Sequence, residues 1–280
     1  MTLPETAQPA PQPAPLWHSF RLGDFRVTTL LSGTREMTDA HATYGLNVDA
    51  ETFERISREA GQPTDRWSNS FTPTLVETGT ETVLFDTGLM PEGIVTALTA
   101  SGHSPEDITL IVLTHMHGDH IGGLMQNGRP VFPNARLIAG RREWDHWAMA
   151  GNDGFERLVR PFARHITLIE DGDSPFPGAT AILAPGHTPG HMAFRLTSGE
   201  ARLMLTADTA NHALWSVSHP DWEVRFDIDK ARAIETRKRL LGQIADEGVP
   251  FIGYHMPFPA VGFLERDTGG FRFRAAGDRP

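Results

Sequence analysis

The chain of 280 residues is 39% apolar and 21% charged, an ordinary globular composition with enough apolar residues for a large core. The absence of cysteine excludes disulfides, thiol nucleophiles and thiolate metal ligands. A net charge of −10 without any lysine or arginine cluster argues against a nucleic-acid partner, and no apolar run approaches the ~20 residues that span a bilayer.

Residues 1–15, MTLPETAQPAPQPAP, are rich in proline and alanine, with neither a basic start nor an apolar block. This composition predicts a disordered tail that ends near Pro15. We expect a single domain over residues 16–280, because no linker composition interrupts the chain up to residue 265. A cytoplasmic location fits the missing cysteines; a periplasmic one would require that a signal peptide has been removed.

Apolar runs of strand length recur along the chain. Residues 25–33 alternate roughly like a strand, and residues 82–88 form a short run that ends in a carboxylate and a glycine. Residues 91–102 predict a helix with Pro91 at its first position. Residues 108–115 predict a strand that is buried on both faces. Further strands are expected at residues 135–140, 179–187, 201–208 and 249–255.

An amphipathic pattern predicts a long helix at residues 231–248, with Gly248 as its stop. Strands and helices are thus interleaved, which indicates an α/β protein. The last three of the expected strands end on a histidine or an aspartate, as residues 108–115 do. Because strand interiors build a core and their ends carry loops, we expect these polar side chains to do chemistry at the strand ends.

The stretch LTHMHGDHIGG crowds His115, His117, Asp119 and His120 into six positions behind a buried strand. Alternate residues of a strand face the same way, so His115 and His117 can converge on one point. If the chain turns into a helix at Gly118, the other two side chains point to a neighbouring position. Packing alone rarely explains so many ligand-type side chains, and the motif therefore predicts two adjacent metal sites.

Each site still lacks ligands, because Zn²⁺ usually takes about four. His187, Asp208 and His255 stand at other strand ends and can supply them. One arrangement completes the ligand sets of both sites. It places His115, His117 and His187 on one metal and Asp119, His120 and His255 on the other, with Asp208 as the bridge.

Other polar side chains are expected around the metals. Asp86 is expected to orient a ligand histidine through its other ring nitrogen, and the alternative is a simple turn residue. His191 fits a supporting hydrogen bond better than ligation. Trp144 and Trp147, in a stretch that looks rich in loops, and Asn211 and His212 are candidates for the substrate pocket. The alternatives are a core position for the tryptophans and a solvated loop for the other two.

The motifs THMHGDH, FDTG, PGHTPGH, TADT and YHMPFP, in this order, resemble the metallo-β-lactamase superfamily. The resemblance covers roughly residues 16–265. It implies a four-layer αβ/βα sandwich with the metals at one rim, and the same seven metal ligands. Shorter motifs near both ends are similar to the methyl parathion hydrolase branch, which includes organophosphate, lactone and aryl-ester hydrolases; the resemblance also suggests a homodimer.

Three departures qualify this resemblance. N-acyl homoserine lactonases carry a substrate-contacting tyrosine three residues after the bridging aspartate, where this chain has Asn211. The di-iron oxygen reductases carry a glutamate in place of His117. The nuclease branches have an inserted domain or a nucleic-acid-binding arm, and neither is found here.

The expected function is hydrolysis of lactones, aryl esters or organophosphotriesters by a hydroxide held on two Zn²⁺ ions, with Mn, Co or Fe as other possible metals. Asp119 is the candidate catalytic residue, because it can handle a proton. β-Lactam hydrolysis and a mono-iron persulfide dioxygenase reaction are alternatives on the same fold. A non-catalytic metal-binding scaffold is the alternative from another class.

Overall fold

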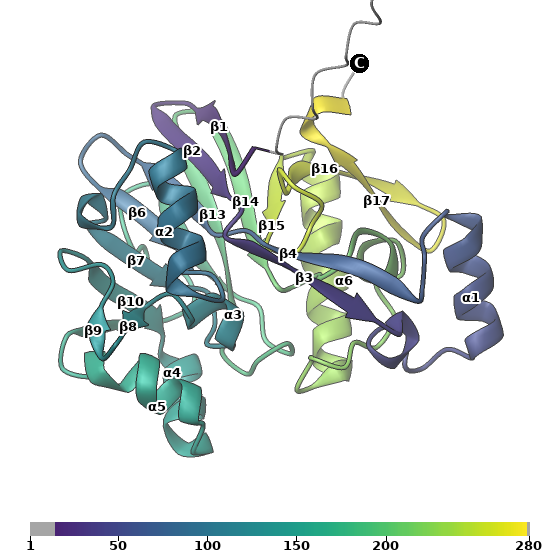
Figure 1. Ribbon diagram of the computed structural model, residues 1–280. Helices are drawn as coiled ribbons and strands as arrows, with labels where there is room; N and C mark the ends of the chain where they lie inside the picture. Colours follow the sequence, from purple (N-terminus) through teal and green to yellow (C-terminus); the bar gives the residue numbers. More distant parts are fainter. Residues whose placement is uncertain (1–14, 279–280) are drawn as a thin grey trace, which may run out of the picture.

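The computed structural model describes residues 15–278, so the expected tail lies outside the described residues except for Pro15. Two β-sheets pack face to face through a shared apolar core, and helices lie beside their outer faces (Figure 1). This architecture is the αβ/βα sandwich that the family resemblance implies. None of the described helices is long and apolar enough to cross a membrane.

Strands of the first sheet hydrogen-bond in the order β1-β2-β5-β6-β7-β10-β11. They are β1 (Trp17–Leu22), β2 (Phe25–Leu30), β5 (Thr74–Glu77), β6 (Thr82–Phe85), β7 (Leu110–Leu113), β10 (Arg136–Gly140) and β11 (Ile166–Ile169). The second sheet runs β12 (Ala179–Leu183), β13 (Met192–Ser198), β14 (Ala201–Ala207), β15 (Phe251–Gly253), β16 (Val261–Asp267) and β17 (Gly270–Ala275). Two two-stranded sheets stand apart. One pairs β3 (Gly33–Thr38) with β4 (Arg66–Phe71), and the other is a hairpin of β8 (Met125–Gln126) and β9 (Arg129–Pro130).

Helices α2, α4 and α5 lie beside the first sheet, and α6 lies beside the second (Figure 1). The α-helices are α1 (Ala50–Glu59), α2 (Pro91–Ala100), α3 (Gly118–Ile121), α4 (Arg141–Ala150), α5 (Asp153–Leu158) and α6 (Lys230–Glu247). Short helical turns are η1 (Ala40–Ala42), η2 (Pro105–Asp107), η3 (Arg160–Phe162), the π-turn η4 (Ala213–Ser218) and η5 (Ala276–Asp278).

Strand β7 shows how the layers are built. Leu110 and Val112 join the core between the sheets, where they belong to the same apolar cluster as Phe194. Ile111 and Leu113 belong to a second cluster, which also contains the buried face of α2. Because successive side chains point to opposite faces, β7 is buried on both sides, as its uninterrupted apolar sequence predicts.

Helix α6 covers the second sheet with one apolar face. The Asp229 side chain caps it by accepting a hydrogen bond from the backbone of the first turn, and Gly248 ends it in the left-handed conformation with φ of 60°. Leu240, Leu241 and Ile244 are fully buried. The helix predicted for residues 231–248 is therefore confirmed to within one residue at each end.

One edge of the sandwich collects the ends of several strands. β14 and β15 are parallel, so Asp208 and His255, which follow them, emerge at the same edge. The loop of residues 184–191 joins the antiparallel strands β12 and β13 at this edge as well. The loop after β7 reaches it from the first sheet. The topology thus brings four distant segments together.

The interpretation of residues 141–155 as a loop-rich stretch is wrong. Helices α4 and α5 occupy most of it. Trp144 and Trp147 stand three positions apart on α4 and turn into the cluster on the outer face of the first sheet, together with Phe155. The spacing of a helix, which places residues three and four apart on one face, explains these aromatic side chains.

Candidate metal centre

The loop after β7 carries the crowded motif. His117 is the N-cap of the single-turn helix α3, and Asp119 and His120 lie within this turn. The strand ends at Leu113, two residues earlier than predicted, so His115 and His117 lie in the connecting loop rather than on a strand face. The chain turns into a helix at Gly118, as expected. His115 and His117 point toward one region, and the two residues in α3 point to its neighbour.

The glycines after the motif allow a close approach between two loops. A Cβ atom on Gly122 would overlap the carbonyl of Leu89, and one on Gly123 would overlap the carbonyl of Thr87. The backbone and hydroxyl of Thr87 both donate hydrogen bonds to the carbonyl of His120, at 2.7 and 2.9 Å. The glycines thus let the motif loop pack against the loop that follows β6.

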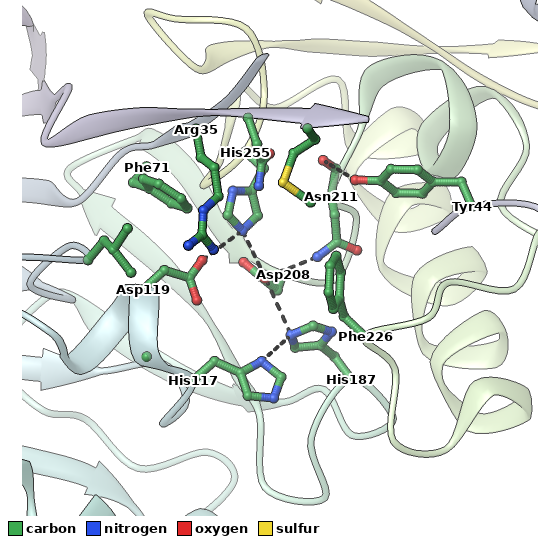
Figure 2. Close-up of a pocket in the computed structure, with 14 residues that line it drawn as sticks. Arg35, Tyr44, Phe71, His117, Asp119, His187, Asp208, Asn211, Phe226 and His255 are labelled. Atoms are coloured by element: carbon green, nitrogen blue, oxygen red, sulfur yellow. Dashed lines mark hydrogen bonds and ion pairs between the residues drawn. The ribbon is translucent and has the colours of Figure 1, made fainter. Parts of the chain in front are cut away.

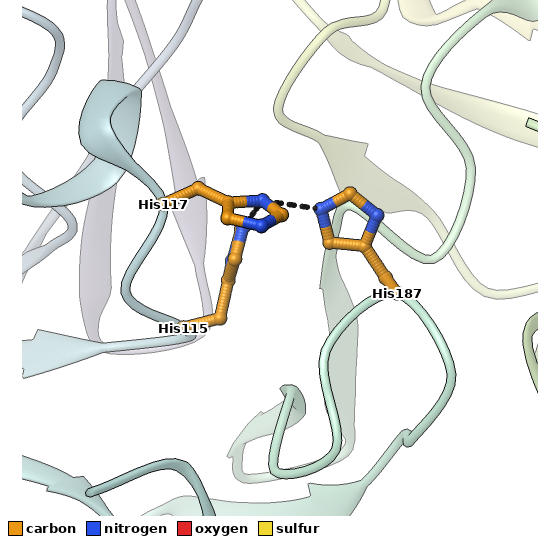
Figure 3. Close-up of side chains that lie close together, drawn as sticks. All are labelled: His115, His117 and His187. Atoms are coloured by element: carbon orange, nitrogen blue, oxygen red, sulfur yellow. Dashed lines mark hydrogen bonds between the residues drawn. The ribbon is translucent and has the colours of Figure 1, made fainter. Parts of the chain in front are cut away.

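Three imidazoles converge in the first group (Figure 3). Nδ1 of His117 lies 3.2 Å from Nε2 of His115 and 2.9 Å from Nε2 of His187. His115 and His117 come from one loop, whereas His187 comes from the other sheet. These three are the ligands that the sequence assigns to one metal.

Hydrogen bonds on the far side of two rings fix their tautomers. Thr114 donates its hydroxyl hydrogen to Asp86 at 2.7 Å, so its oxygen is left to accept from Nδ1 of His115 at 3.1 Å. Nδ1 of His187 donates to the Asp227 carboxylate at 2.9 Å. Nε2 of each ring therefore presents a lone pair to His117. A single proton on His117 cannot satisfy both, whereas a cation can.

Protonation of this group is unfavourable. Burial, with nearby imidazoles adding to it, holds the pKa of His115 well below its usual range. Burial and the neighbouring His187 lower the pKa of His117 to about 3. His115 and His117 are thus neutral near pH 7, which is the form that binds metals.

The second group consists of Asp119, His120 and His255. Oδ2 of Asp119 lies 3.4 Å from Nε2 of His255 and 3.7 Å from Nε2 of His120. Nδ1 of His120 donates to Asp86 at 2.8 Å, and Nδ1 of His255 donates to the backbone carbonyl of Ser70 at 2.8 Å. Both rings therefore turn Nε2 toward the site.

Asp208 lies between the two groups. Its carboxylate is 3.3 Å from Nε2 of His187 in the first group, and 3.2 and 3.1 Å from those of His120 and His255 in the second. Nε2 of His120 and Oδ1 of Asp208 are buried and have no hydrogen-bond partner among the described residues. Such orphaned buried atoms are costly, and bound cations would satisfy them. The donor set therefore fits a pair of metal ions with Asp208 as the bridge.

Residues around the ligands hold them in place. Asp86 has a left-handed backbone with φ of 61°, and its buried carboxylate binds Thr114 and His120. Its predicted role of orienting a ligand histidine matches this geometry. Nε2 of His191 accepts from the backbone N–H of Asp208 at 3.1 Å, so His191 supports the loop rather than joining either ligand group.

Asp227 and Arg237 form a buried ion pair behind the first group. Arg237 donates to Asp227 at 2.7 Å and to the backbone carbonyls of Thr209, Pro220 and Trp222. Both side chains are fully buried. The pair thus connects His187 to α6 and to the residue that follows Asp208. No motif in the sequence distinguishes Asp227 from the capping Asp229. The sequence therefore does not predict that Asp227 supports a ligand histidine.

A cavity of about 330 Å³ opens above the ligands (Figure 2). Its floor contains ligand residues from both groups, and its walls mix apolar and polar side chains. The β3–β4 sheet supplies Arg35, Met37, Asn69 and Phe71, and other segments supply Tyr44, Leu89, Asn211 and Phe226. Arg35, Tyr44 and Phe226 were not predicted, because their sequence neighbourhoods contain no ligand motif.

The structure places one of the four predicted pocket residues in this cavity. Asn211 lines it, and its amide donates to Asp208 at 3.0 Å. Trp144 and Trp147 are not among its lining residues, because α4 turns them toward the apolar cluster. His212 caps η4 and stacks on Trp215, with ring centroids 4.0 Å apart, and it lines a neighbouring cavity instead.

Tyr44 occupies the space beside Asn211. Its buried hydroxyl lies 3.4 Å from the backbone carbonyl of Asn211, and it lines the cavity. A tyrosine is therefore present on this wall even though position 211 does not provide one. It comes from a segment more than 160 residues away in the chain.

The family model of the metallo-beta-lactamase superfamily matches residues 72–247. The chain belongs to the metallo-β-lactamase superfamily. The match includes the β7 loop, His187 and Asp208, and leaves out β3, β4 and His255. The superfamily predicted from the motifs is thus confirmed.

Two curated relatives carry lactonase names. The chain is 29% identical over 163 residues to an N-acyl homoserine lactonase of Bacillus cereus, which covers 58% of this chain and 61% of the relative. It is 34% identical over 163 residues to N-acyl homoserine lactonase AttM of Azorhizobium caulinodans, and this match covers 53% of this chain and 59% of the relative. The match spans about three fifths of the length of these curated relatives.

Two solved structures resemble the whole metallo-β-lactamase fold of this chain. One is AidC, a dizinc quorum-quenching lactonase in complex with a product, with a TM-score of 0.86, 24% identity and coverage of 94% of this chain and 98% of AidC. The other is the hydrolase AbOPH, with a TM-score of 0.87, 22% identity and coverage of 96% and 100%. At these identities the likeness shows the fold.

Proposed function

We propose that this protein is a dinuclear metal-dependent hydrolase that opens lactone rings. The observation that carries the proposal is the pair of ligand groups on either side of Asp208, beneath a cavity large enough for a small molecule. The lactonase names of the curated relatives support lactones as the substrate class.

Two Zn²⁺ ions suit this donor set. His115, His117 and His187 would hold one ion, and Asp119, His120 and His255 the other, with Asp208 between them. Neutral imidazoles and carboxylates without thiolates are typical of zinc sites, although Mn, Co and Fe accept the same ligands. Once bound, a pair of ions lowers the pKa of water toward ~7 and polarises the oxygen that gains charge.

The cavity walls would bind and orient the substrate. Met37, Phe71, Leu89 and Phe226 offer apolar contacts for a ring or an acyl substituent. Tyr44, which can donate or accept a hydrogen bond, lies on the same wall as Asn211. These groups would place the carbonyl of a lactone over the shared carboxylate of Asp208.

Asp119 is the candidate catalytic residue. Its side chain is 23% exposed and lines the cavity, whereas the other metal-ligand carboxylate, Asp208, is buried. An oxygen of Asp119 that faces the cavity can take the proton released on attack and return it to the leaving oxygen. Metal binding reduces the basicity of this carboxylate, so the proton is held only briefly.

A substrate panel tests the proposal. The zinc-loaded protein is assayed on N-hexanoyl homoserine lactone, an aryl ester, an organophosphotriester and a β-lactam, with metal content measured in parallel. We expect turnover of the lactone that disappears with a chelator and returns with Zn²⁺. Aryl esters and phosphotriesters are the next substrates that the same attack can cleave.

The metal content separates the rival functions. Two zinc ions per chain with no lactone turnover would overturn the proposal and favour another substrate of the panel. A single iron per chain with persulfide oxidation would favour a dioxygenase. Full metal loading without activity on any substrate would favour a metal-binding scaffold.

A further inference from the structure

Glu143 is a buried carboxylate that neither the motifs nor the ligand groups include. It lies in the first turn of α4, directly after β10, and its side chain is 1% exposed. No arginine, lysine or histidine among the described residues forms an ion pair with it. A buried charge without a counter-ion is costly, so hydrogen bonds from the protein must replace the hydration that the carboxylate loses on burial.

Four donors surround this carboxylate, two for each oxygen. Oε1 accepts from the backbone N–H of Met116 at 3.0 Å and from the Trp147 indole at 2.6 Å. Oε2 accepts from the Thr188 hydroxyl at 2.6 Å and from the backbone N–H of Gly190 at 3.1 Å. Burial raises the pKa of Glu143, whereas the hydrogen bonds to both oxygens and the start of a helix favour its ionised form.

Three of these donors belong to the two loops that carry the first ligand group, and the fourth, Trp147, lies on α4 itself. Met116 lies between His115 and His117, and Thr188 follows His187. A single side chain therefore bridges segments that are more than 70 residues apart and that supply the closest pair of nitrogens in the site, 2.9 Å apart.

The backbone around Gly190 is shaped to fit this contact. A Cβ atom at Gly190 would overlap the backbone of Arg142 and Glu143, so only glycine lets the loop approach the start of α4. A separate backbone hydrogen bond, from Met192 at the start of β13 to Thr114 after β7 at 2.9 Å, joins the two sheets beneath the loops. This contact does not involve the carboxylate and can remain when the carboxylate is changed.

We propose that Glu143 is a positioning residue that sets the spacing between His117 and His187 by bridging Met116 to Thr188 and Gly190. This inference rests on the proposed metal site. The bridge keeps both loops at the separation that one cation needs. It touches neither Asp119 nor His255, so its effect falls on the first ion and spares the second.

The test is Glu143→Gln in the full chain, with Zn²⁺ binding as the readout. The glutamine keeps one acceptor oxygen, but its amide group faces two donors and pushes one loop away. Chelator-treated protein is titrated with Zn²⁺ against a chromogenic competitor, which reports both affinities. We expect a loss of about 10- to 100-fold for one ion, the range found when partners of metal ligands are removed, and an unchanged second ion.

Glu200→Gln is the matched control, because it makes the same chemical change at an exposed turn between β13 and β14. It should bind both ions as the unchanged protein does. Equal weakening of both ions in Glu143→Gln, together with earlier unfolding of its metal-free form, would indicate a merely structural role and overturn the inference. Two unchanged affinities would overturn it too.

A second pair of variants keeps the test informative if Glu143→Gln does not fold. Thr188→Val removes one donor to the carboxylate, whereas Thr188→Ser retains the hydroxyl. We expect weaker binding of the same ion in the valine variant and recovery in the serine variant. If the unchanged protein itself binds no pair of ions, the proposed function fails first, and the two failures are thereby distinguished.

Discussion

Asp208 is the residue on which both ligand groups depend. It lies within 3.3 Å of a histidine from the first group and of two from the second. The carboxylate has two oxygens in contact with imidazoles, which a neutral side chain of similar size cannot replace. Burial opposes ionisation of Asp208, but His255 and His120 outweigh it and hold its pKa well below the usual range.

Asp208→Ala should empty at least one metal position and reduce turnover of every active substrate by orders of magnitude. Both sites lose a ligand at once, and metal analysis with kinetics on the lactone measures the effect. Asp221→Ala, at an exposed aspartate, is the control. Unchanged metal content in Asp208→Ala would refute its bridging role.

Arg237 matters for stability in a different way. It neutralises Asp227 and binds three backbone carbonyls, all within the protein interior. Removal of one partner from a buried ion pair leaves the other charge uncompensated, which typically costs about 3–5 kcal/mol. The charge left behind would lie next to the ring of His187.

Arg237→Met should therefore lower the free energy of unfolding by roughly 3–5 kcal/mol, measured by urea denaturation. Arg232→Met removes an exposed arginine from the same helix and should change it by less than about 1 kcal/mol. Similar values for the two variants would show that the buried pair contributes little.

At the scale of elements, η4 is held by an unusual cap. Nδ1 of His212 accepts hydrogen bonds from the backbone of Leu214 and Trp215, at 3.1 and 3.2 Å. A protonated ring would lose this acceptor, and burial lowers the pKa of His212 to about 3. The element therefore requires a neutral histidine.

This requirement gives a pH dependence with a definite sign. Below about pH 6.5 the unfolded chain takes up a proton at His212, whereas the folded protein stays neutral there down to about pH 3. Stability contributed by this group is present above pH 6.5 and falls as the pH drops, by up to about 1.4 kcal/mol per pH unit.

His212→Asn keeps a capping acceptor and removes the titrating ring. In this variant the free energy of unfolding should fall less steeply between about pH 6 and pH 4, because unfolding takes up nearly one proton fewer. Urea denaturation of the metal-free protein at several pH values measures this slope. The same substitution at the exposed His165 is the control. Parallel pH profiles for the unchanged protein and His212→Asn would contradict this account.

At the scale of the whole molecule, the metal ligands come from both halves of the sandwich. His115, His117, Asp119 and His120 follow a strand of the first sheet, and the other three follow strands of the second. Bound ions would therefore connect the two sheets. Any ligand that binds only the folded state stabilises it by mass action.

We expect Zn²⁺ to raise the thermal midpoint and a chelator to lower it. Free Zn²⁺ at 100 times its dissociation constant should add about 2.7 kcal/mol per independent site. Differential scanning calorimetry over a series of Zn²⁺ concentrations measures this shift. A midpoint that does not depend on Zn²⁺ would contradict a metal site formed by both halves.

Local patterns in the sequence determined a large part of this protein. Apolar runs predicted strands such as β7, and the amphipathic pattern predicted α6, because alternation and helical spacing are properties of neighbouring residues. The dense motif from His115 to His120 predicted metal binding, since the ability to bind a metal ion depends on the type of side chain. The other ligands stood out because polar residues at the ends of apolar strands are conspicuous.

Only the tertiary structure decided which distant segments form the pocket and support the ligands. Tyr44 reaches the cavity through packing of the segment between β3 and β4, and Glu143 and Asp227 meet their partners through contacts across loops. The residues next to them in the sequence form no motif that indicates these roles. Long-range contacts depend on how whole layers pack, and a short pattern of residues does not encode that packing.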